Sequence, residues 1–268
     1  MPPLPSSSTW AVTTAAMQTK WQHKYQRAPG KWVFVPTEES RAEGKAIKEA
    51  VEDKWQPPTY YYHLRAGGHV ASLRSHVNNT YFLRLDIQDF FGSVTRSRVT
   101  RSLKKIFGYE RARQMANDST VKHPADKNRA MLPYGFVQSP TLASLALFDS
   151  RLGGYLEQLK KIKYVVVSVY MDDIIVSTKR KKRLADIHKE LVAASVKSRF
   201  NFQPDKTEGP AIKISAFNIE LGSGDIQVTP ERLQEFYDAF KKTSSLLEKN
   251  GIAGYVSSVN PAQATLLV

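Results

Sequence analysis

Residues 163–178 read Lys-Tyr-Val-Val-Val-Ser-Val-Tyr-Met-Asp-Asp-Ile-Ile-Val-Ser-Thr, two apolar runs interrupted only by Asp172 and Asp173. Such β-branched and aromatic runs, bounded by charged residues, are typical of buried strands. With the acids at the turn, the sequence predicts a hairpin that holds two carboxylates at its tip. Acids are depleted in strands and almost never buried unpaired, so we expect a cation or a hydrogen-bond donor there. An ordinary Asp-rich turn is the alternative.

A third acid of the same kind lies upstream. Residues 81–91 read Tyr-Phe-Leu-Arg-Leu-Asp-Ile-Gln-Asp-Phe-Phe, a predicted strand in which Asp86 stands where a core residue is expected. Two strands of one sheet can place Asp86 and Asp172 side by side, and clustered carboxylates repel unless protons or cations lie between them. Hard oxygen ligands suit Mg²⁺. Two such ions about 4 Å apart can activate a 3′-hydroxyl and stabilise a leaving pyrophosphate, so the pattern predicts phosphoryl transfer.

Composition and charge fit a polyanionic partner. The 268 residues are 41% hydrophobic, enough for one large domain or two subdomains, and 39 basic against 25 acidic residues give a formal charge of +14. A field of that sign attracts phosphate backbones, although a ribosomal or membrane-surface protein would also be basic. The absence of cysteine excludes disulfides, thiolate metal sites and cysteine nucleophiles. There is no signal-peptide core and no membrane-length apolar run, so we expect a soluble, cytoplasmic protein with no membrane partner.

The first third of the chain is less informative. Residues 1–37, which include Trp10, are interpreted as an N-terminal extension. Its Trp21, Tyr25 and Trp32, which lie among basic residues, either stack on nucleic-acid bases or, as we favour, pack onto the domain. A helical stripe predicts a helix over residues 38–55. Residues 60–64 are predicted as a strand leading to a glycine turn at 65–69, where Arg65 and Arg74 could reach a triphosphate.

The remaining elements follow from periodicity and caps. We expect a helix over 97–107, helix plus loop over 108–130, and a turn-rich loop over 132–140 with Ser139 as N-cap of a helix running toward Leu159. A helix spans 184–200. Residues 212–221 and 226–228 are predicted to form a second hairpin, and Thr229 to cap a last helix. The five cations Lys179, Arg180, Lys181, Lys182 and Arg183 are either a solvated helix start or a nucleic-acid contact.

Four motifs, in this order, resemble those of reverse transcriptases over roughly residues 60–229. Leu85–Phe91 resembles motif A, Leu132–Pro140 motif B, Tyr170–Asp173 motif C and Asn201–Thr207 motif D, while Phe217–Leu221 lies where the primer-grip hairpin belongs. The resemblance implies an α+β right-hand polymerase, in which an antiparallel palm sheet carries the catalytic aspartates. The fingers would comprise 38–80 and 108–140, the palm 81–107 and 141–228, and a short thumb or C-terminal helix 229–268.

The resemblance also implies residue roles. Asp86, Asp172 and Asp173 would be catalytic and would hold Mg²⁺, with Mn²⁺ as an alternative and the Ile87 carbonyl completing the site. Phe91 would be the steric gate against a ribose 2′-hydroxyl, and Lys206 would approach the triphosphate. The other residues expected at the nucleotide are Tyr134, Gly135, Gln138, Arg65 and Arg74. The residues expected at nucleic acid are Tyr170, Met171 and the five cations at 179–183.

Within the family, residues 135–147, 150–153 and Phe217-Asn218 are similar to bacterial unknown-group and abortive-infection reverse transcriptases of phage defence, with retron enzymes as the nearest alternative. Tyr134 replaces a common glutamine, which leaves untemplated or protein-primed synthesis open, and an idle nucleic-acid-binding scaffold is the alternative from another class. Expected partners are an RNA template or non-coding RNA, a DNA product and deoxynucleoside triphosphates. Because the thumb is short, we also expect a structured RNA, a partner protein or self-assembly to help hold the duplex.

Overall fold

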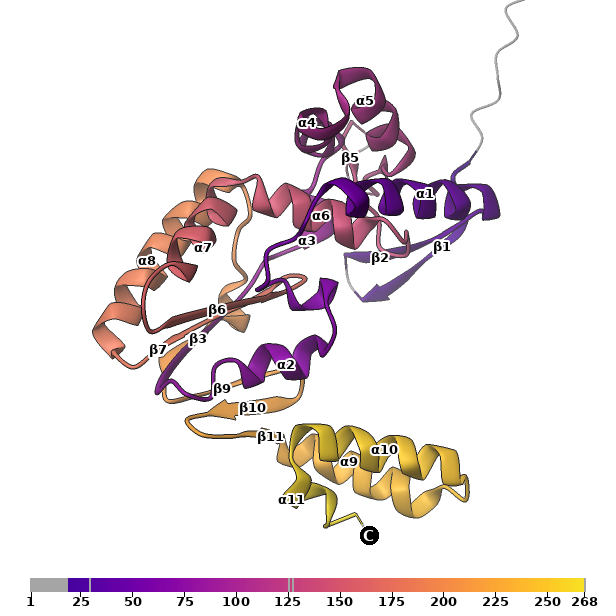
Figure 1. Cartoon of the computed structure of the whole chain (residues 1–268). Helices are drawn as coiled ribbons and strands as arrows, with labels where there is room; N and C mark the ends of the chain where they lie inside the picture. The colour runs from indigo at the N-terminus through magenta and orange to yellow at the C-terminus, as the bar shows by residue number, and fades with distance from the viewer. Residues whose placement is uncertain (1–18, 29, 125, 127, 268) are drawn as a thin grey trace, which may run out of the picture.

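A four-stranded antiparallel sheet lies at the centre of the computed structural model, which describes residues 19–28, 30–124, 126 and 128–267 (Figure 1). Its order is β6 (Val165–Tyr170), β7 (Asp173–Thr178), β3 (Tyr81–Asp86) and β8 (Glu208–Ala211). Every residue of β7 is buried because this strand has neighbours on both edges and is covered by helices. Both predicted acid-bearing strands, and the antiparallel pairing between them, are therefore confirmed.

Helices α6 (Ser139–Phe148), α7 (Arg151–Lys160) and α8 (Lys181–Ser198) contribute to the same core cluster as the sheet (Figure 1). The prediction of one continuous helix toward Leu159 is wrong, because the helix ends at Phe148 and a second helix begins at Arg151. The Ser150 hydroxyl caps α7 by accepting a hydrogen bond from the Gly153 amide. A Cβ at Gly153 would lie 2.2 Å from the Leu147 carbonyl oxygen, so only glycine permits this close joint. The helix begins at Ser139 with Gln138 as its cap residue, one position earlier than predicted.

The upper lobe in Figure 1 contains α1 (Glu38–Lys54), α4 (Arg96–Phe107), α5 (Tyr109–Asp118) and two short strands, β4 (Val121–Lys122) and β5 (Ala130–Met131). A hairpin of β1 (Trp21–Ala28) and β2 (Lys31–Pro36) belongs to the same lobe. Its Phe34 amide donates to the Tyr134 carbonyl at 2.9 Å. Residues 19–37 are thus an integral part of the fold. The pattern does not predict this hairpin because most of β1 is exposed and shows no apolar alternation; Trp10 lies outside the described residues.

Residues 60–64 correct another prediction. They form a 3₁₀ turn, η1 (Tyr62–Leu64), and only Tyr61 makes an isolated β-bridge, with Val169. The next element is α2 (Gly68–Arg74), which begins after Gly67 in the left-handed region at φ 91°. The apolar character that suggested a strand instead buries the Tyr60 and Tyr61 rings in the core.

A second, three-stranded sheet follows, with order β11 (Ile226–Val228), β10 (Ile219–Gly222) and β9 (Lys213–Ala216). The sequence predicted residues 212–221 as one strand, but the chain reverses at Phe217 and Asn218, whose φ angles are 58° and 59°. Two consecutive left-handed residues form the tight turns that match strand twist in hairpins. An aromatic residue rarely adopts this conformation, so its side chain gave no sign of the turn.

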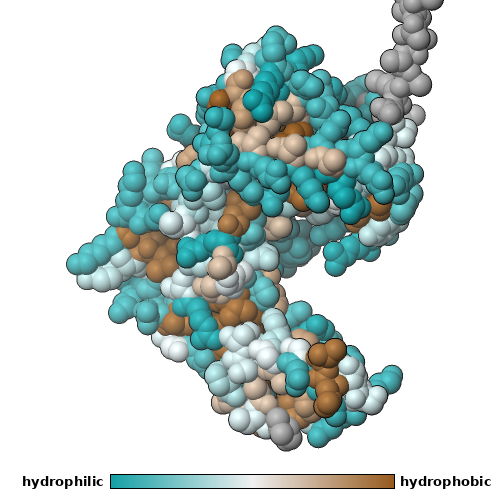
Figure 2. Space-filling view, turned by 45° about the vertical axis from the view of Figure 1, so that its right-hand side comes forward, coloured by the Kyte–Doolittle hydropathy of each residue, from teal (hydrophilic) through white to brown (hydrophobic). Residues whose placement is uncertain are grey.

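Three helices, rather than one, end the described chain: α9 (Pro230–Lys242), α10 (Leu246–Val259) and α11 (Pro261–Ala264). Thr229 stands at the cap position of α9, but its side chain makes no capping bond. On α9, Leu233, Phe236 and Phe240 are half-buried, whereas Tyr237 is 39% exposed. Figure 2 shows apolar surface over these helices and a hollow between them and the upper lobe. Within the described part of the chain, none of the helices has the length and hydrophobicity that crossing a bilayer requires.

Candidate active site

Three carboxylates meet at one end of the central sheet. Asp86, the last residue of β3, is the register partner of Asp173, the first residue of β7. The Ile87 amide donates to the Asp172 carbonyl at 2.8 Å, which extends the pairing into the turn. Met171 has a φ of 57°, and this residue and Asp172 form the two-residue connection between β6 and β7. The predicted gathering of Asp86, Asp172 and Asp173 is therefore present in the structure.

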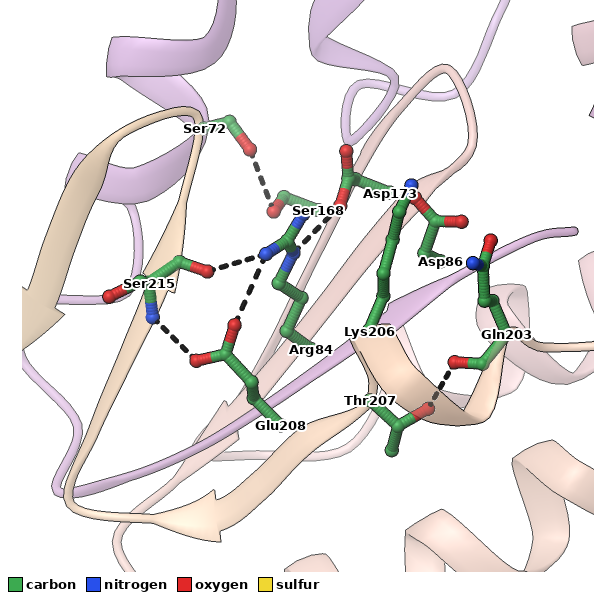
Figure 3. A network of polar contacts seen from close by, with 10 residues as sticks. All are labelled: Ser72, Arg84, Asp86, Ser168, Asp173, Gln203, Lys206, Thr207, Glu208 and Ser215. Carbon is green, nitrogen blue, oxygen red and sulfur yellow. Dashed lines mark hydrogen bonds and ion pairs between the residues drawn. The ribbon is translucent and has the colours of Figure 1, made fainter. Parts of the chain in front are cut away.

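Two of these carboxylates are paired with cations, one from the 3₁₀ helix η2 (Pro204–Lys206) and one from β3 (Figure 3). Lys206 Nζ lies 2.8 Å from Asp86 Oδ2, and Arg84 Nε lies 2.8 Å from Asp173 Oδ1. Arg84 also contacts Glu208 Oε1 at 3.2 Å and donates to the Ser215 carbonyl at 2.7 Å. Lys206 was expected near the triphosphate, whereas Arg84 was missed. Its signal was in the sequence, because residues two apart on a strand face the same side, so Arg84 shares a side with Asp86.

The third carboxylate, Asp172, raises the negative charge of the site. Burial first, and then the charges of Asp173 and Asp86, raise the pKa of Asp172 to about 6, while Lys206 opposes the shift. Burial also raises the pKa of Asp173, against the lowering effect of Arg84. The excess negative charge in a half-buried place is the condition that a bound cation relieves.

The donor atoms at this end of the sheet fit a divalent cation. They are hard carboxylate oxygens, which Mg²⁺ prefers, and the Lys206 ammonium already stands as a cation on Asp86. Among the described residues, no three acidic, histidine or cysteine side chains are arranged as a ready metal cluster, and Asp173 is paired with Arg84. Asp86 and Asp172 are therefore the residues best suited to hold a metal.

A histidine that the sequence analysis missed supports the turn. The Met171 amide donates to His63 Nδ1 at 3.0 Å, so Nδ1 is unprotonated and Nε2 carries the hydrogen that faces Ser144 Oγ at 2.7 Å. Ser144 in turn donates to the Pro140 carbonyl in α6. Burial lowers the pKa of His63 to about 4, which keeps the imidazole neutral near pH 7. His63 thus connects the turn at Met171 to the start of α6.

The two aromatic residues predicted at the nucleotide contact each other. The rings of Phe91 and Tyr134 are 4.6 Å apart at 84°, an edge-to-face pair. Burial and the charges of Asp172, Asp89 and Asp86 raise the pKa of Tyr134. The Tyr134 hydroxyl therefore interacts with the carboxylates of the site. Gly135 has a φ of 101°, and a Cβ there would lie 2.2 Å from the Phe34 carbonyl oxygen. Glycine at position 135 is therefore required for the close packing of this loop against β2.

Three of the other predicted nucleotide contacts point elsewhere. Gln138 is 1% exposed and packs beside Gly44 of α1 and Ser119, so it lies in the core. Arg74 donates to the carbonyls of Ser258 and Val259 at the end of α10, where a cation stabilises a helix C-terminus. Arg65 donates to the Thr59 carbonyl. Each of these side chains has a protein partner in the structure, and its contact with a nucleotide stays a prediction.

The predicted nucleic-acid contacts divide in two groups. Tyr170 lies beside the carboxylates, with its ring 5.1 Å from that of Phe217 in the β9–β10 turn. The five cations at 179–183 follow β7 at its far end, and are exposed except for the half-buried Arg183. A strand rises about 3.4 Å per residue, so the length of β7 separates them from Asp173. The cations thus lie at the start of α8, away from the carboxylates, and their contact with nucleic acid stays a prediction.

The sheet, its three carboxylates and the helices behind it define the fingers and palm of a polymerase. Residues 23–217 match the family "Reverse transcriptase (RNA-dependent DNA polymerase)", and the chain belongs to this family of enzymes. The solved structures that it resembles include a telomerase from Candida albicans in complex with a fragment of telomeric RNA, with a TM-score of 0.56 and 9% identity over 88% of this chain. The predicted α+β polymerase fold is confirmed.

A foamy viral protease-reverse transcriptase in complex with double-stranded DNA aligns with a TM-score of 0.49 and 17% identity over 86% of this chain. This chain spans 53% of the telomerase chain and 34% of the foamy viral chain. The bacterial subgroup that the sequence resembles is not distinguished by these relatives, and it stays a prediction.

Proposed function

We propose that this chain is an RNA-directed DNA polymerase, which adds deoxynucleotides to a 3′-hydroxyl by phosphoryl transfer with two Mg²⁺ ions, or Mn²⁺ in their place. The observation that carries the proposal is the meeting of Asp86, Asp172 and Asp173 at one end of the sheet, with Lys206 on Asp86. When bound, the metal supplies activation of the hydroxyl and neutralises charge on the leaving pyrophosphate. Asp86 and Asp172 would hold it, with the Ile87 carbonyl as a further oxygen.

The chain's own residues then position the reactants. Arg84 of β3 fixes the carboxylate of Asp173 and is itself paired with Glu208 of β8. Lys206 would leave Asp86 for the triphosphate when a metal takes over its charge, since an ammonium and a divalent ion compete for one carboxylate. Phe91, braced by the edge of Tyr134, would exclude a ribose 2′-hydroxyl. His63 holds the Met171 amide and so keeps the turn in place.

We further propose a role in bacterial anti-phage defence, with a non-coding RNA or a partner protein, in the cytoplasm. The motif B segment at 135–147 and Phe217-Asn218 support this assignment over a retron enzyme. The formal charge of +14 supports an RNA or DNA partner. The C-terminal helices α9 to α11 would act as the thumb, and Arg74 ties them to the palm. Three intact carboxylates argue against an idle scaffold.

The test is polymerisation by protein purified from its native host. It would be incubated with Mg²⁺ and labelled deoxynucleotides, first without template and then with a primed RNA, beside an Asp172→Ala variant. Labelled polymer from the wild type alone supports the proposal, and its sequence identifies the template or shows untemplated synthesis. Silence of both proteins on every template would instead favour the scaffold alternative.

The sugar gate has a separate test. Phe91→Ala opens the space that the ring fills, so we expect ribonucleotide incorporation to rise relative to deoxynucleotides by roughly tenfold or more. The measurement is the ratio of kcat/KM for the two sugars with one base. Phe90→Ala is the matched control, since Phe90 is the buried neighbour that packs on Phe200. Unchanged discrimination in Phe91→Ala would refute the gate.

A further inference from the structure

A cavity of about 940 Å³ opens beside the palm, lined by α4, the joint between α6 and α7, the end of α8 and the loop after β3. Its volume lies in the range of small-molecule sites. The lining includes none of the three catalytic aspartates, although Gln88 and Asp89 follow Asp86 in the same loop. In Figure 1, α4 lies in the upper lobe and α7 and α8 lie below it and to the left. The cavity is thus a separate space next to the catalytic loop.

Seven basic side chains line this cavity, against two acidic ones. Arg98, Arg101 and Lys105 recur on one face of α4, because residues three and four apart in a helix share a face. The end of α8 adds Lys197 and Arg199. The remaining two basic residues are Arg129 and Arg151. The formal charge of the lining is therefore +5.

Arg98 is crowded by other basic side chains of the cavity. Burial first, and then the charges of Arg101, Arg199 and Arg129, lower the pKa of Arg98. Its guanidinium stacks 4.2 Å from the Phe200 ring and donates to the Ser198 carbonyl, yet its Nη1 is buried with no hydrogen-bond partner. Arg129 Nε is buried and unpartnered as well. A buried donor without an acceptor is costly, so an anion that accepts from these groups would be stabilised.

The two acids leave most of this charge uncompensated. Asp149 is used by Lys105, whose Nζ lies 2.7 Å from Oδ1. Asp89, whose φ is 45°, interacts electrostatically with His123 and Arg129. In addition, α7 begins at the cavity, where Ser150 and Arg151 line the wall. The Leu152 and Gly153 amides of α7 are already bonded to Ser198 Oγ and Ser150 Oγ, so α7 contributes the positive end of its dipole rather than free amides.

We propose that this cavity is a binding site for a ligand with two or more adjacent phosphate groups. A lining charge of +5 needs several negative charges in a small space, and forked guanidinium groups match phosphate oxygens in bidentate geometry. The phosphates come from a free polyphosphate, such as a nucleoside triphosphate, or from a single strand of nucleic acid. The site goes beyond the proposed polymerase function, which needs only the end of the sheet.

The proposal is tested by titration calorimetry of the full chain in buffer without divalent ions. The probes are inorganic tripolyphosphate and a single-stranded oligoribonucleotide with a 5′-hydroxyl. We expect one equivalent to bind, and the double variant Arg101→Gln with Arg151→Gln to weaken binding at least about tenfold. Both side chains are exposed at the rim, so the substitutions spare the core. Arg41→Gln with Arg111→Gln removes the same charge from exposed positions of α1 and α5 and is the matched control.

Each outcome decides the proposal. Tenfold weakening in the cavity variant, with an unchanged control, supports it, and the probe that shows this pattern identifies the phosphate source. Equal weakening in both double variants means general attraction by a basic surface and overturns it, as does the absence of binding by either probe. Loss of binding in Lys206→Gln, with the cavity variant unaffected, would place the ligand at the aspartates and also overturn it. Because no divalent ion is present, failure of polymerase activity leaves this result untouched.

Discussion

The end of the sheet and the basic cavity concentrate charge in opposite ways. At the sheet, Lys206 and Arg84 of the same chain neutralise two of three carboxylates. In the cavity, the buried nitrogens of Arg98 and Arg129 have no acceptor. At the sheet, a bound metal ion could therefore replace a side-chain cation of the protein. In the cavity, the unpartnered nitrogens need an anion from outside the chain. The difference shows how a resident ion pair and an unbalanced cluster each prepare a site for a charged ligand.

Breaking the negative side of this comparison has the largest expected effect. Asp86→Asn removes the carboxylate that Lys206 holds, so we expect primer extension to fall by roughly a thousandfold or more, since metal and charge stabilisation supply most of phosphoryl transfer. The measurement is kcat/KM on a primed RNA. Asp205→Asn is the control, because Asp205 is exposed in η2 (Pro204–Lys206) and neighbours the same lysine in sequence. A loss of less than tenfold would contradict the assigned role of Asp86.

Removing the internal cation at Asp173 should have the next largest effect. Arg84→Met leaves the buried carboxylate of Asp173 without its partner, so we expect the free energy of unfolding to fall by about 3 kcal/mol. The measurement is urea unfolding near neutral pH. Because a lone carboxylate escapes the cost by protonation, the loss should shrink toward about pH 4.

Arg232→Met is the matched control for this variant. Arg232 pairs with Glu235 on the exposed side of α9, and an exposed pair contributes less than about 1 kcal/mol. A similar loss in both variants, or a loss in Arg84→Met that does not depend on pH, would show that Arg84 acts through packing and not through Asp173.

The parts of the site that could be predicted from sequence are those that follow the two-residue alternation of a strand. Asp86 and Asp172 stand out because an acid interrupts an apolar run, and Arg84 could have been found by the same alternation. His63 could not, since its contact with Met171 joins residues 108 positions apart through a non-regular turn. The cavity could not be predicted either. Its basic residues come from four segments, and each segment alone reads as an ordinary solvated helix face or loop.

The turn at Phe217 shows another limit. Local preference opposes a left-handed aromatic residue, but the Phe217 ring packs on Tyr170 and His69, which lie far away in sequence. Likewise, the β1–β2 hairpin becomes stable through Phe34, Val121 and Met131 rather than through its own pattern. Tertiary contacts therefore decided the elements that periodicity missed.

Neutralising the excess charge at Asp172 should stabilise the free protein. Its pKa is raised to about 6 by burial and by Asp173 and Asp86. Between about pH 4 and pH 6 the folded state binds more protons than the unfolded one, so stability falls as pH rises through this window and stays low above it. Asp172→Asn removes the effect. We expect a gain of about 2 kcal/mol at pH 7.5 that vanishes below pH 4.

The measurement is urea unfolding across that pH range without divalent ions, and Asp205→Asn again serves as control. Addition of Mg²⁺ should stabilise the wild type and not Asp172→Asn, because a ligand stabilises only the state that binds it. A variant that is less stable than the wild type at pH 7.5 would show that the Asp172 carboxylate contributes more by hydrogen bonding than it costs by repulsion.

The smallest expected effect tests the positive side of the comparison by the same logic. Arg101 is one of the charges that lower the pKa of Arg98, so Arg101→Gln should stabilise the ligand-free protein, by a few tenths of a kcal/mol because Arg101 is exposed and screened by solvent. Thermal unfolding at low ionic strength would detect the gain, and about 0.5 M salt should abolish it by screening. Arg111→Gln, on the next helix, should give no such gain. If both variants behave alike, or if the gain persists in high salt, then the cavity holds no local excess of positive charge. The comparison with the acidic end of the sheet would then be wrong.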